Sequence, residues 1–301
     1  MNLFSDLTSK NNLKVNKYTV KGKSIIIDTD NGKYALKKDN NIRLFKYLES
    51  KNYHHFPKVI DYTRESSMYE YIEDIKYDEE ERALDLIRTL ALLHNKTSFY
   101  KEVTEFEIKE LYEDILSKIN YITNYYIDLI NVIESKIYMS PSEYLLARNI
   151  SKVFSATYYC KNELEKFLTE NKDIKRKRVV TLHNNVDTTN LLRNEHSYLI
   201  SWNNSSVDMP IYDIINFYDK RCLDFDFEFL LTEYEKINPL KKEEKTLLFI
   251  LISLPYKVEF TTNEYQNTKN IRKFLDKIYK TEYILKFEKE KKSANTKENE
   301  H

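Results

Sequence analysis

The segment VVTLHNNVDTTNLLRNEHSYLISWNNSSVDMPIYDIINFYDK, residues 179–220, decides the fold. It contains two short apolar runs, VVTLHNNV (179–186) and SYLISWNN (197–204), which flank a polar loop. Short apolar runs bounded by turn-forming residues predict strands. Helical periodicity resumes from about residue 211. The segment therefore predicts two short strands that present a polar loop within helical sequence.

A small antiparallel sheet is predicted upstream, over about residues 12–73. Between residues 15 and 38, three β-branched and aromatic runs alternate with turn signals. Asp30-Asn31-Gly32 predicts a hairpin, because Asn and Gly tolerate the positive φ of a tight turn. A helix is expected over 41–51, followed by strands in PKVIDYT (57–63) and SMYEYIE (67–73).

Helical periodicity dominates the rest of the chain. Residues 81–97, 107–135 and 142–171 predict three helices. Residues 172–178 read as a charged connector, and the tail from about 289 has too little apolar surface for a packed core. These elements predict an α+β, two-lobed fold with a small antiparallel β N-lobe and a mostly helical C-lobe, which is the order of elements found in the protein kinase-like fold. The predicted parts are a β-rich lobe over 1–75, a helical lobe over 76–288 and a disordered tail over 289–301.

Composition excludes several classes of function. Basic and acidic residues balance at 48 each, so no strong field favours nucleic acid. Only two glycines are present among 301 residues, which excludes a glycine-rich phosphate loop. No apolar run reaches the roughly 18 residues of a membrane span. The two cysteines, Cys160 and Cys222, are expected to be reduced structural thiols in a cytoplasmic protein.

The 179–220 segment resembles the catalytic segment of the aminoglycoside phosphotransferase and choline kinase superfamily. That family shows His-x-Asp, an Asn five residues beyond this Asp, a hydrophobic strand with an Asp, and a later Tyr-Asp-Leu. His183, Asn190 and Tyr212-Asp213-Ile214 stand at matching positions. Upstream, Lys37 matches the strand lysine, and Leu93-His94 matches a pair that ends the first helix of the C-lobe.

The C-terminal part narrows the resemblance. PLKKEEKTLLFILISLPYKVEF (239–260) and NEYQNTKN (263–270), followed by a lysine-rich helix, resemble the CotS spore coat protein family. With both parts counted, the resemblance spans about residues 12–289. It implies a structural or binding component with other proteins as partners, incorporated into the spore coat.

Two carboxylates that the family uses for phosphoryl transfer are replaced. Asn185 stands at the base position, and an amide cannot take the proton of an acceptor hydroxyl. Ser201 stands at the metal-binding position, where Mg²⁺ prefers a carboxylate. Asp187 and Asp208 lie nearby, and a shifted loop would let Asp187 substitute for the base.

The resemblance also gives roles to the remaining residues. Lys37, Asn190 and Ser201 would line a nucleotide site, although Lys37 can equally be a surface strand lysine and Asn190 a loop residue. His183 and Asp213 would organise the catalytic loop as structural residues. No metal site is expected, and neither is a cofactor; ATP with weak or absent Mg²⁺ is the alternative.

The sequence thus favours a pseudokinase that acts as a structural or binding component. One alternative is an active or weakly active ATP-dependent phosphotransferase that acts on a small hydroxylated substrate. Another is a regulatory pseudokinase that binds nucleotide without metal. Asn185 and Ser201 are the features that point away from the active enzyme.

Overall fold

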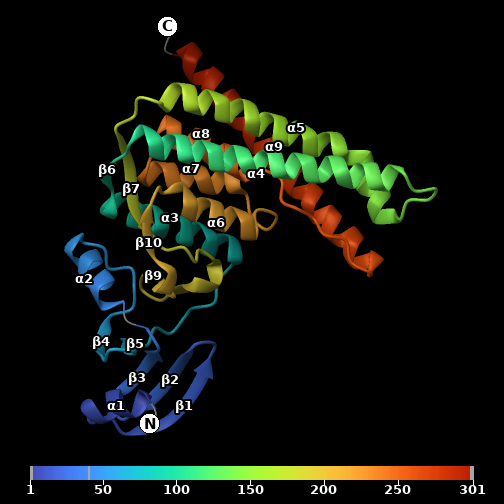
Figure 1. The fold of residues 1–301 in the computed structure, drawn as a ribbon. Helices are drawn as coiled ribbons and strands as arrows, with labels where there is room; N and C mark the ends of the chain where they lie inside the picture. Colours follow the sequence, from blue (N-terminus) through green and yellow to red (C-terminus); the bar gives the residue numbers. More distant parts are fainter. Residues whose placement is uncertain (1–2, 40, 299–301) are drawn as a thin grey trace. The chain divides into compact units, whose positions relative to one another are not determined.

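The structure, a computed structural model, describes residues 3–39 and 41–298 (Figure 1). The chain forms two compact units that interleave along the sequence. Unit 1 comprises Met1–Phe99, Val180–Asp208 and Leu230–Pro239, and unit 2 comprises Tyr100–Val179, Met209–Phe229 and Leu240–His301. The predicted lobes are continuous stretches of chain that meet near residue 75, whereas these units are each made of separated segments. The predicted boundary therefore stays a prediction.

The N-terminal part of unit 1 is a five-stranded antiparallel sheet in the order β1-β2-β3-β5-β4. Its strands are β1 (Val15–Lys21), β2 (Ser24–Thr29), β3 (Gly32–Lys37), β4 (Val59–Tyr62) and β5 (Ser67–Glu70). The hairpin between β2 and β3 pairs Thr29 with Gly32, whose φ is +123°. The strands predicted between residues 15 and 73 are therefore confirmed, as is the helix predicted over 41–51, which is α2 (Ile42–Ser50).

The two faces of this sheet have different surroundings. On one face, Ile27, Leu36 and Met68 form a buried cluster with Leu7 of α1 (Leu3–Lys10). Strand alternation places Ala35 and Lys37 on the opposite face. The sheet is thus anchored by an apolar cluster on one side and offers polar and small side chains on the other.

The rest of unit 1 surrounds α3 (Glu79–Thr97). The short elements of unit 1 are β8 (Leu191–Arg193), β9 (Ser197–Leu199), β10 (Ser206–Asp208), the 3₁₀ turns η1 (Thr188–Asn190) and η2 (Trp202–Asn204), and the end of β7 (Arg176–Leu182). The first residues of β7, up to Val179, belong to unit 2. β8 pairs with β9, and β10 pairs with the end of β7. On α7 (Phe227–Ile237), Tyr234 is hydrogen-bonded through its hydroxyl to His94 Nδ1 at 2.7 Å. The strands predicted around the polar loop are therefore present.

Unit 2 is helical. Its elements are β6 (Phe99–Glu102), α4 (Glu105–Glu134), α5 (Pro141–Asn171), α6 (Ile211–Arg221), α8 (Lys242–Ser253) and α9 (Glu264–Glu298). Both α4 and α5 begin with a capping box, at Thr104 and Ser140. Tyr126 on α4 and Phe274 on α9 stack at 5.5 Å within a core to which α5 adds Leu146 and Val153.

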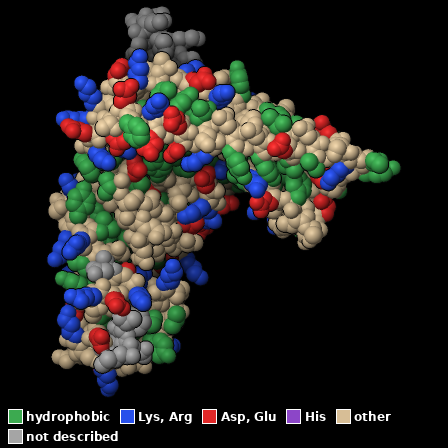
Figure 2. All heavy atoms as spheres, in the orientation of Figure 1, with side chains coloured by type: hydrophobic (Ala, Val, Ile, Leu, Met, Phe, Trp, Pro, Cys, Tyr) green, Lys and Arg blue, Asp and Glu red, His purple; other side chains and the backbone are tan. Residues whose placement is uncertain are grey.

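The surface of unit 2 carries mixed charge. On the face drawn in Figure 2, basic and acidic side chains lie interspersed over its helices. Apolar side chains gather at the turn between α4 and α5, where Ile137 and Tyr138 are 90% and 88% exposed. No helix among the described residues combines the length and apolarity that a membrane span requires.

Two segments differ from the sequence-based expectation. β7 begins at Arg176, so the end of the predicted connector 172–178 is part of a strand. α9 continues through residues 289–298, for which composition predicted disorder, and residues 299–301 lie outside the described residues. Charged residues can occupy a strand or helix whose position is set by neighbouring packed residues, and composition alone does not show this.

Candidate functional site

A cavity of about 210 Å³ lies within unit 1. Its volume is below the roughly 300–1,000 Å³ that is typical of pockets for drug-sized ligands. The open face of the sheet, the segment after β5 and the chain around η2 enclose it. The polar residues and aromatic side chains that line it are Lys21, Ser24, Lys37, Asp39, Asn41, Phe45, Tyr69, Glu70, Tyr71, Asp74, Ser201 and Trp202.

Lys37 lines this cavity, as the alternation of β3 predicts. The neighbouring strand residues in register are Ser24 on β2 and Ser67 on β5. Burial lowers the pKa of the Lys37 ammonium, and the Asp39 carboxylate acts in the opposite direction. Lys37 therefore lies in a partly desolvated site with one acidic neighbour.

Asp39 was not predicted as a site residue. Its carboxylate accepts a hydrogen bond from the Tyr69 hydroxyl at 2.7 Å, and its carbonyl accepts one from Ser67 at 3.1 Å. Burial raises the pKa of the Tyr69 hydroxyl most, and the nearby Asp39 carboxylate raises it further. The hydroxyl therefore keeps its proton and donates a hydrogen bond to Asp39. Asp39 lies two residues after Lys37, and strand alternation places every second side chain on the same face. This spacing could have predicted that Asp39 lies near Lys37.

Helix α2 supplies no acidic partner to Lys37. Its residue that lines the cavity is Phe45, whereas Arg43 and Glu49 are exposed. Phe45 stacks on Phe56 at 4.6 Å and meets Trp202 edge-on at 6.1 Å. An aromatic cluster thus occupies the side of the cavity formed by this helix.

Ser201 lies in the same cavity as Lys37. Its backbone is left-handed, with φ 68° and ψ 50°, at the start of η2. The next residue, Trp202, is buried and donates its indole N–H to the carbonyl of Leu199 at 2.8 Å. The turn therefore holds the Ser201 hydroxyl at the wall of the cavity, and the structure brings these two predicted residues together.

The polar loop after β7 is held by hydrogen bonds to its own backbone. Asn190 donates its amide N–H to the carbonyl of Asn185 at 2.9 Å. Its own carbonyl accepts from the N–H of Ile200 at 3.0 Å. His183 is buried, and its Nε2 is hydrogen-bonded to the carbonyl of Ile200 at 2.8 Å. Asn190 and His183 therefore tie the loop to the residue before Ser201.

Asp187 has a local role in this loop. Its carboxylate accepts hydrogen bonds from the N–H of Thr189 at 3.1 Å and from the Thr189 hydroxyl at 3.2 Å. These bonds cap η1. Asp187 is thus engaged with its own turn, and it is not among the residues that line the cavity.

Asp213 belongs to unit 2. It is fully buried in the first turn of α6. A carboxylate in the first turn is favoured by the positive end of the helix dipole.

Ser201 itself offers a divalent metal a neutral hydroxyl and no carboxylate. Mg²⁺ is normally bound through one or two carboxylates together with phosphate oxygens. Three acids line the cavity: Asp39 accepts a hydrogen bond from Tyr69, Asp74 forms an ion pair with Arg82 at 3.0 Å, and Glu70 is exposed. Over residues 3–39 and 41–298, no group of three or more His, Cys, Asp or Glu side chains is placed to hold a metal ion.

Solved structures of similar fold cover nearly the whole chain. An aminoglycoside phosphotransferase from Alicyclobacillus acidocaldarius matches with a TM-score of 0.68 at 11% identity, over 92% of each chain. The AMP-bound complex of spectinomycin phosphotransferase APH(9)-Ia matches with a TM-score of 0.52 at 12% identity, over 90% of this chain and 94% of that one. The fold is that of the aminoglycoside phosphotransferases. The predicted kinase-like fold is thereby confirmed.

The remaining comparisons add no further evidence on the fold. Choline kinase LicA from Streptococcus pneumoniae has 18% identity and a TM-score of 0.48, over 91% of this chain and 98% of that one. No protein-family model and no curated protein sequence matches the chain. The aminoglycoside phosphotransferase fold is therefore established by structure, and the roles of individual residues stay predictions.

Proposed function

We propose that the protein is a pseudokinase on the aminoglycoside phosphotransferase fold, acting as a structural or binding component. One observation carries the proposal. Positions 185 and 201 hold Asn and Ser, and Asp187, the acid between Asn185 and β8, is engaged in the cap of η1. The loop therefore lacks a carboxylate that is available as a base.

The chemical consequence of these replacements is large. Loss of a general base typically removes about 10²–10⁴ in rate. Ser201 offers a neutral hydroxyl where Mg²⁺ would need a carboxylate. Phosphoryl transfer depends chiefly on positioning and on stabilisation of charge. The two replacements together support the assignment as an inactive kinase.

The cellular role rests on the sequence resemblance. The segments 239–260 and 263–270 resemble the CotS spore coat proteins. On this basis we place the protein in the cytoplasm of a sporulating cell, from which it enters the spore coat and contacts other proteins there.

A regulatory pseudokinase that binds nucleotide without metal is the second candidate. It is favoured by Lys37, which lines the cavity as a partly buried cation. Asp39 beside it reduces the positive field that would attract phosphate groups.

Thermal unfolding of the full chain with ATP, with and without Mg²⁺, tests these functions. We expect no Mg²⁺-dependent stabilisation. A ligand present at 100 times its Kd would add about 2.7 kcal/mol, which is a measurable shift. Stabilisation by ATP alone, lost in Lys37→Met, would establish the regulatory function instead. Mg²⁺-dependent stabilisation with release of ADP would disprove the proposal and show an active phosphotransferase.

A further inference from the structure

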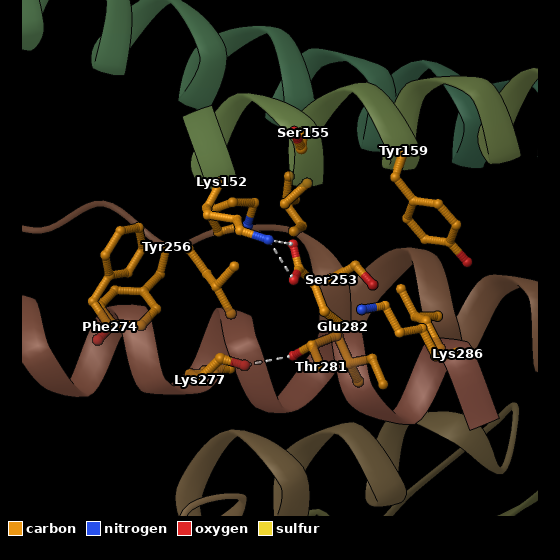
Figure 3. A pocket seen from close by; sticks show the side chains of 16 residues that line it. Lys152, Ser155, Tyr159, Ser253, Tyr256, Phe274, Lys277, Thr281, Glu282 and Lys286 are labelled. Carbon is orange, nitrogen blue, oxygen red and sulfur yellow. Dashed lines mark hydrogen bonds and ion pairs between the residues drawn. The ribbon is translucent and has the colours of Figure 1, made fainter. Parts of the chain in front are cut away.

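A second cavity, of about 280 Å³, lies within unit 2 between α5, the end of α8 and α9 (Figure 3). Its walls are mainly aromatic and aliphatic. Tyr256 meets Phe274 edge-on at 5.1 Å, and Ile278 and Leu285 continue the apolar wall along α9. A mainly apolar pocket with a few polar groups is typical of a site for a small organic molecule.

One polar group in this cavity is buried without a partner. Ser253, the last residue of α8, is 6% exposed, and its hydroxyl makes no hydrogen bond with any described residue. Buried hydroxyl groups in native proteins nearly always have a partner. Ser253 lines the cavity, and a ligand in that space that reaches its covered hydroxyl would supply the missing partner.

The charged side chains around the cavity are mainly basic. Lys152, Lys277 and Lys286 line it together with a single acid, Glu282. Lys152 pairs with Glu282 at 2.9 Å, and Lys277 pairs with Asp219, outside the cavity, at 2.6 Å. Lys286 forms no ion pair with a described residue, and Figure 3 shows its ammonium directed into the space between α5 and α9. One cation therefore remains available to a ligand.

We propose that this cavity binds an amphiphilic organic anion. Its carboxylate would accept hydrogen bonds from the Ser253 hydroxyl and the Lys286 ammonium. Its aromatic or aliphatic body would pack against Tyr256, Phe274 and Ile278. An apolar cavity of about 150 Å³ holds benzene, so about 280 Å³ suits a body of two fused rings. This site uses none of the residues of the unit 1 cavity, and it is independent of the proposed function.

Calorimetric titration of the full chain with 2-naphthoate tests the site. The neutral isostere 2-naphthamide has nearly the same shape and lacks the charge. We expect 2-naphthoate to bind at least tenfold more tightly, because a carboxylate accepts stronger hydrogen bonds from an ammonium than an amide does. No heat of binding at millimolar 2-naphthoate, or equal affinity for the amide, would disprove the proposal.

Variants locate the binding. Ser253→Ala and Lys286→Gln should each weaken 2-naphthoate binding at least tenfold, whereas Lys269→Gln, an exposed lysine elsewhere on α9, should leave it unchanged. Ala156→Phe fills the cavity and should abolish binding, whereas Ser151→Phe on the exposed face of α5 should not. Unchanged affinity in both Ser253→Ala and Lys286→Gln would overturn the site even if Ala156→Phe fails to fold.

Discussion

Ser201 has a left-handed backbone, with φ 68°, in which Asp is also well tolerated. The double replacement Asn185→Asp with Ser201→Asp should therefore fold. We expect the double variant to gain Mg²⁺-dependent thermal stabilisation by ATP, because it restores a carboxylate at both predicted positions. Asn203→Asp, which adds a carboxylate at an exposed neighbouring position, is the control. A folded double variant without this gain would show that positions 185 and 201 are not equivalent to the kinase aspartates.

Lys37 should make stability depend on pH. Burial lowers its folded-state pKa below the ordinary value of 10.5, so the buried charge costs folding free energy while the ammonium stays protonated. At pH values between the folded-state pKa and 10.5, Lys37 is protonated more often in the unfolded chain than in the folded one. The free-energy cost of burying its charge therefore falls as pH rises. Lys37→Met should therefore be more stable than wild type at pH 7, with the difference shrinking toward pH 10.5.

Urea denaturation at pH 7, 9 and 10.5 measures the effect of Lys37→Met. Lys38→Met, at the exposed neighbouring position, should show no such pH-dependent difference. A less stable Lys37→Met variant at pH 7 would mean that attraction to Asp39 exceeds the effect of burial.

The residues of the candidate site were only partly predictable. Strand alternation placed Lys37 on the face with Ala35, and both line the cavity. The pairing of Asp39 with Tyr69 was not predictable, because it joins residues 30 positions apart after β3 and on β5. The sequence Asp187-Thr188-Thr189 is typical of a side-chain cap, which is the role that Asp187 has in the structure, whereas the resemblance had offered Asp187 as a substitute base.

Local signals fixed many elements. Pro141 lies at the first position of α5, where proline is favoured, and Asn31-Gly32 predicted the hairpin between β2 and β3. The start of β7 was missed because Arg176 and its charged neighbours carry no apolar alternation. Arg178 on this strand is nevertheless held by Glu244 of α8, a partner 66 residues away. Such distant pairs set element boundaries that a local pattern does not contain.

Glu244 should be important for linking β7 to α8. Its carboxylate binds Arg178 at 2.8 Å and accepts the N–H of Lys241 at the start of α8. Both partners of the ion pair are largely buried. Breaking a buried ion pair typically costs about 3–5 kcal/mol, so Glu244→Ala should lower the free energy of unfolding by an amount of this order.

Chemical denaturation compares Glu244→Ala with Glu243→Ala, the adjacent acid on α8. Glu243 is about one-third exposed, and its contact with Lys241 is 3.7 Å long. We expect a change within about 1 kcal/mol for Glu243→Ala. Equal effects of the two variants would contradict the role given to Glu244.

At the scale of the whole molecule, unit 1 is assembled from three separated segments. Backbone hydrogen bonds join the first segment to the second: the N–H of Leu199 donates to the carbonyl of His55 at 2.8 Å, and the N–H of Ile75 donates to the carbonyl of Arg193 at 2.9 Å. Trp202 adds an aromatic contact with Phe45. The first segment alone therefore lacks part of its core.

A fragment of residues 1–99 should not fold on its own. We expect poor dispersion in its amide proton–nitrogen NMR spectrum, whereas the full chain should show dispersed signals. The missing partners include Ile237, whose carbonyl accepts from Asn95 at 3.0 Å. A well-dispersed spectrum of the fragment would show that the N-terminal sheet and α3 suffice for a stable structure.

Because unit 1 is made of separated segments, it cannot finish folding until the last of them has been synthesised. Unit 1 is complete only when Pro239 has been made, 140 residues after Phe99 (239 minus 99). At about 5–20 residues per second, ribosomes need on the order of ten seconds for that stretch. Until Trp202 is synthesised in this interval, the rings of Phe45 and Phe56 lack the aromatic partner that packs against them in the folded protein. The nascent chain should therefore be a client of chaperones that shield exposed aromatic surface until translation passes the second segment, which contains Trp202.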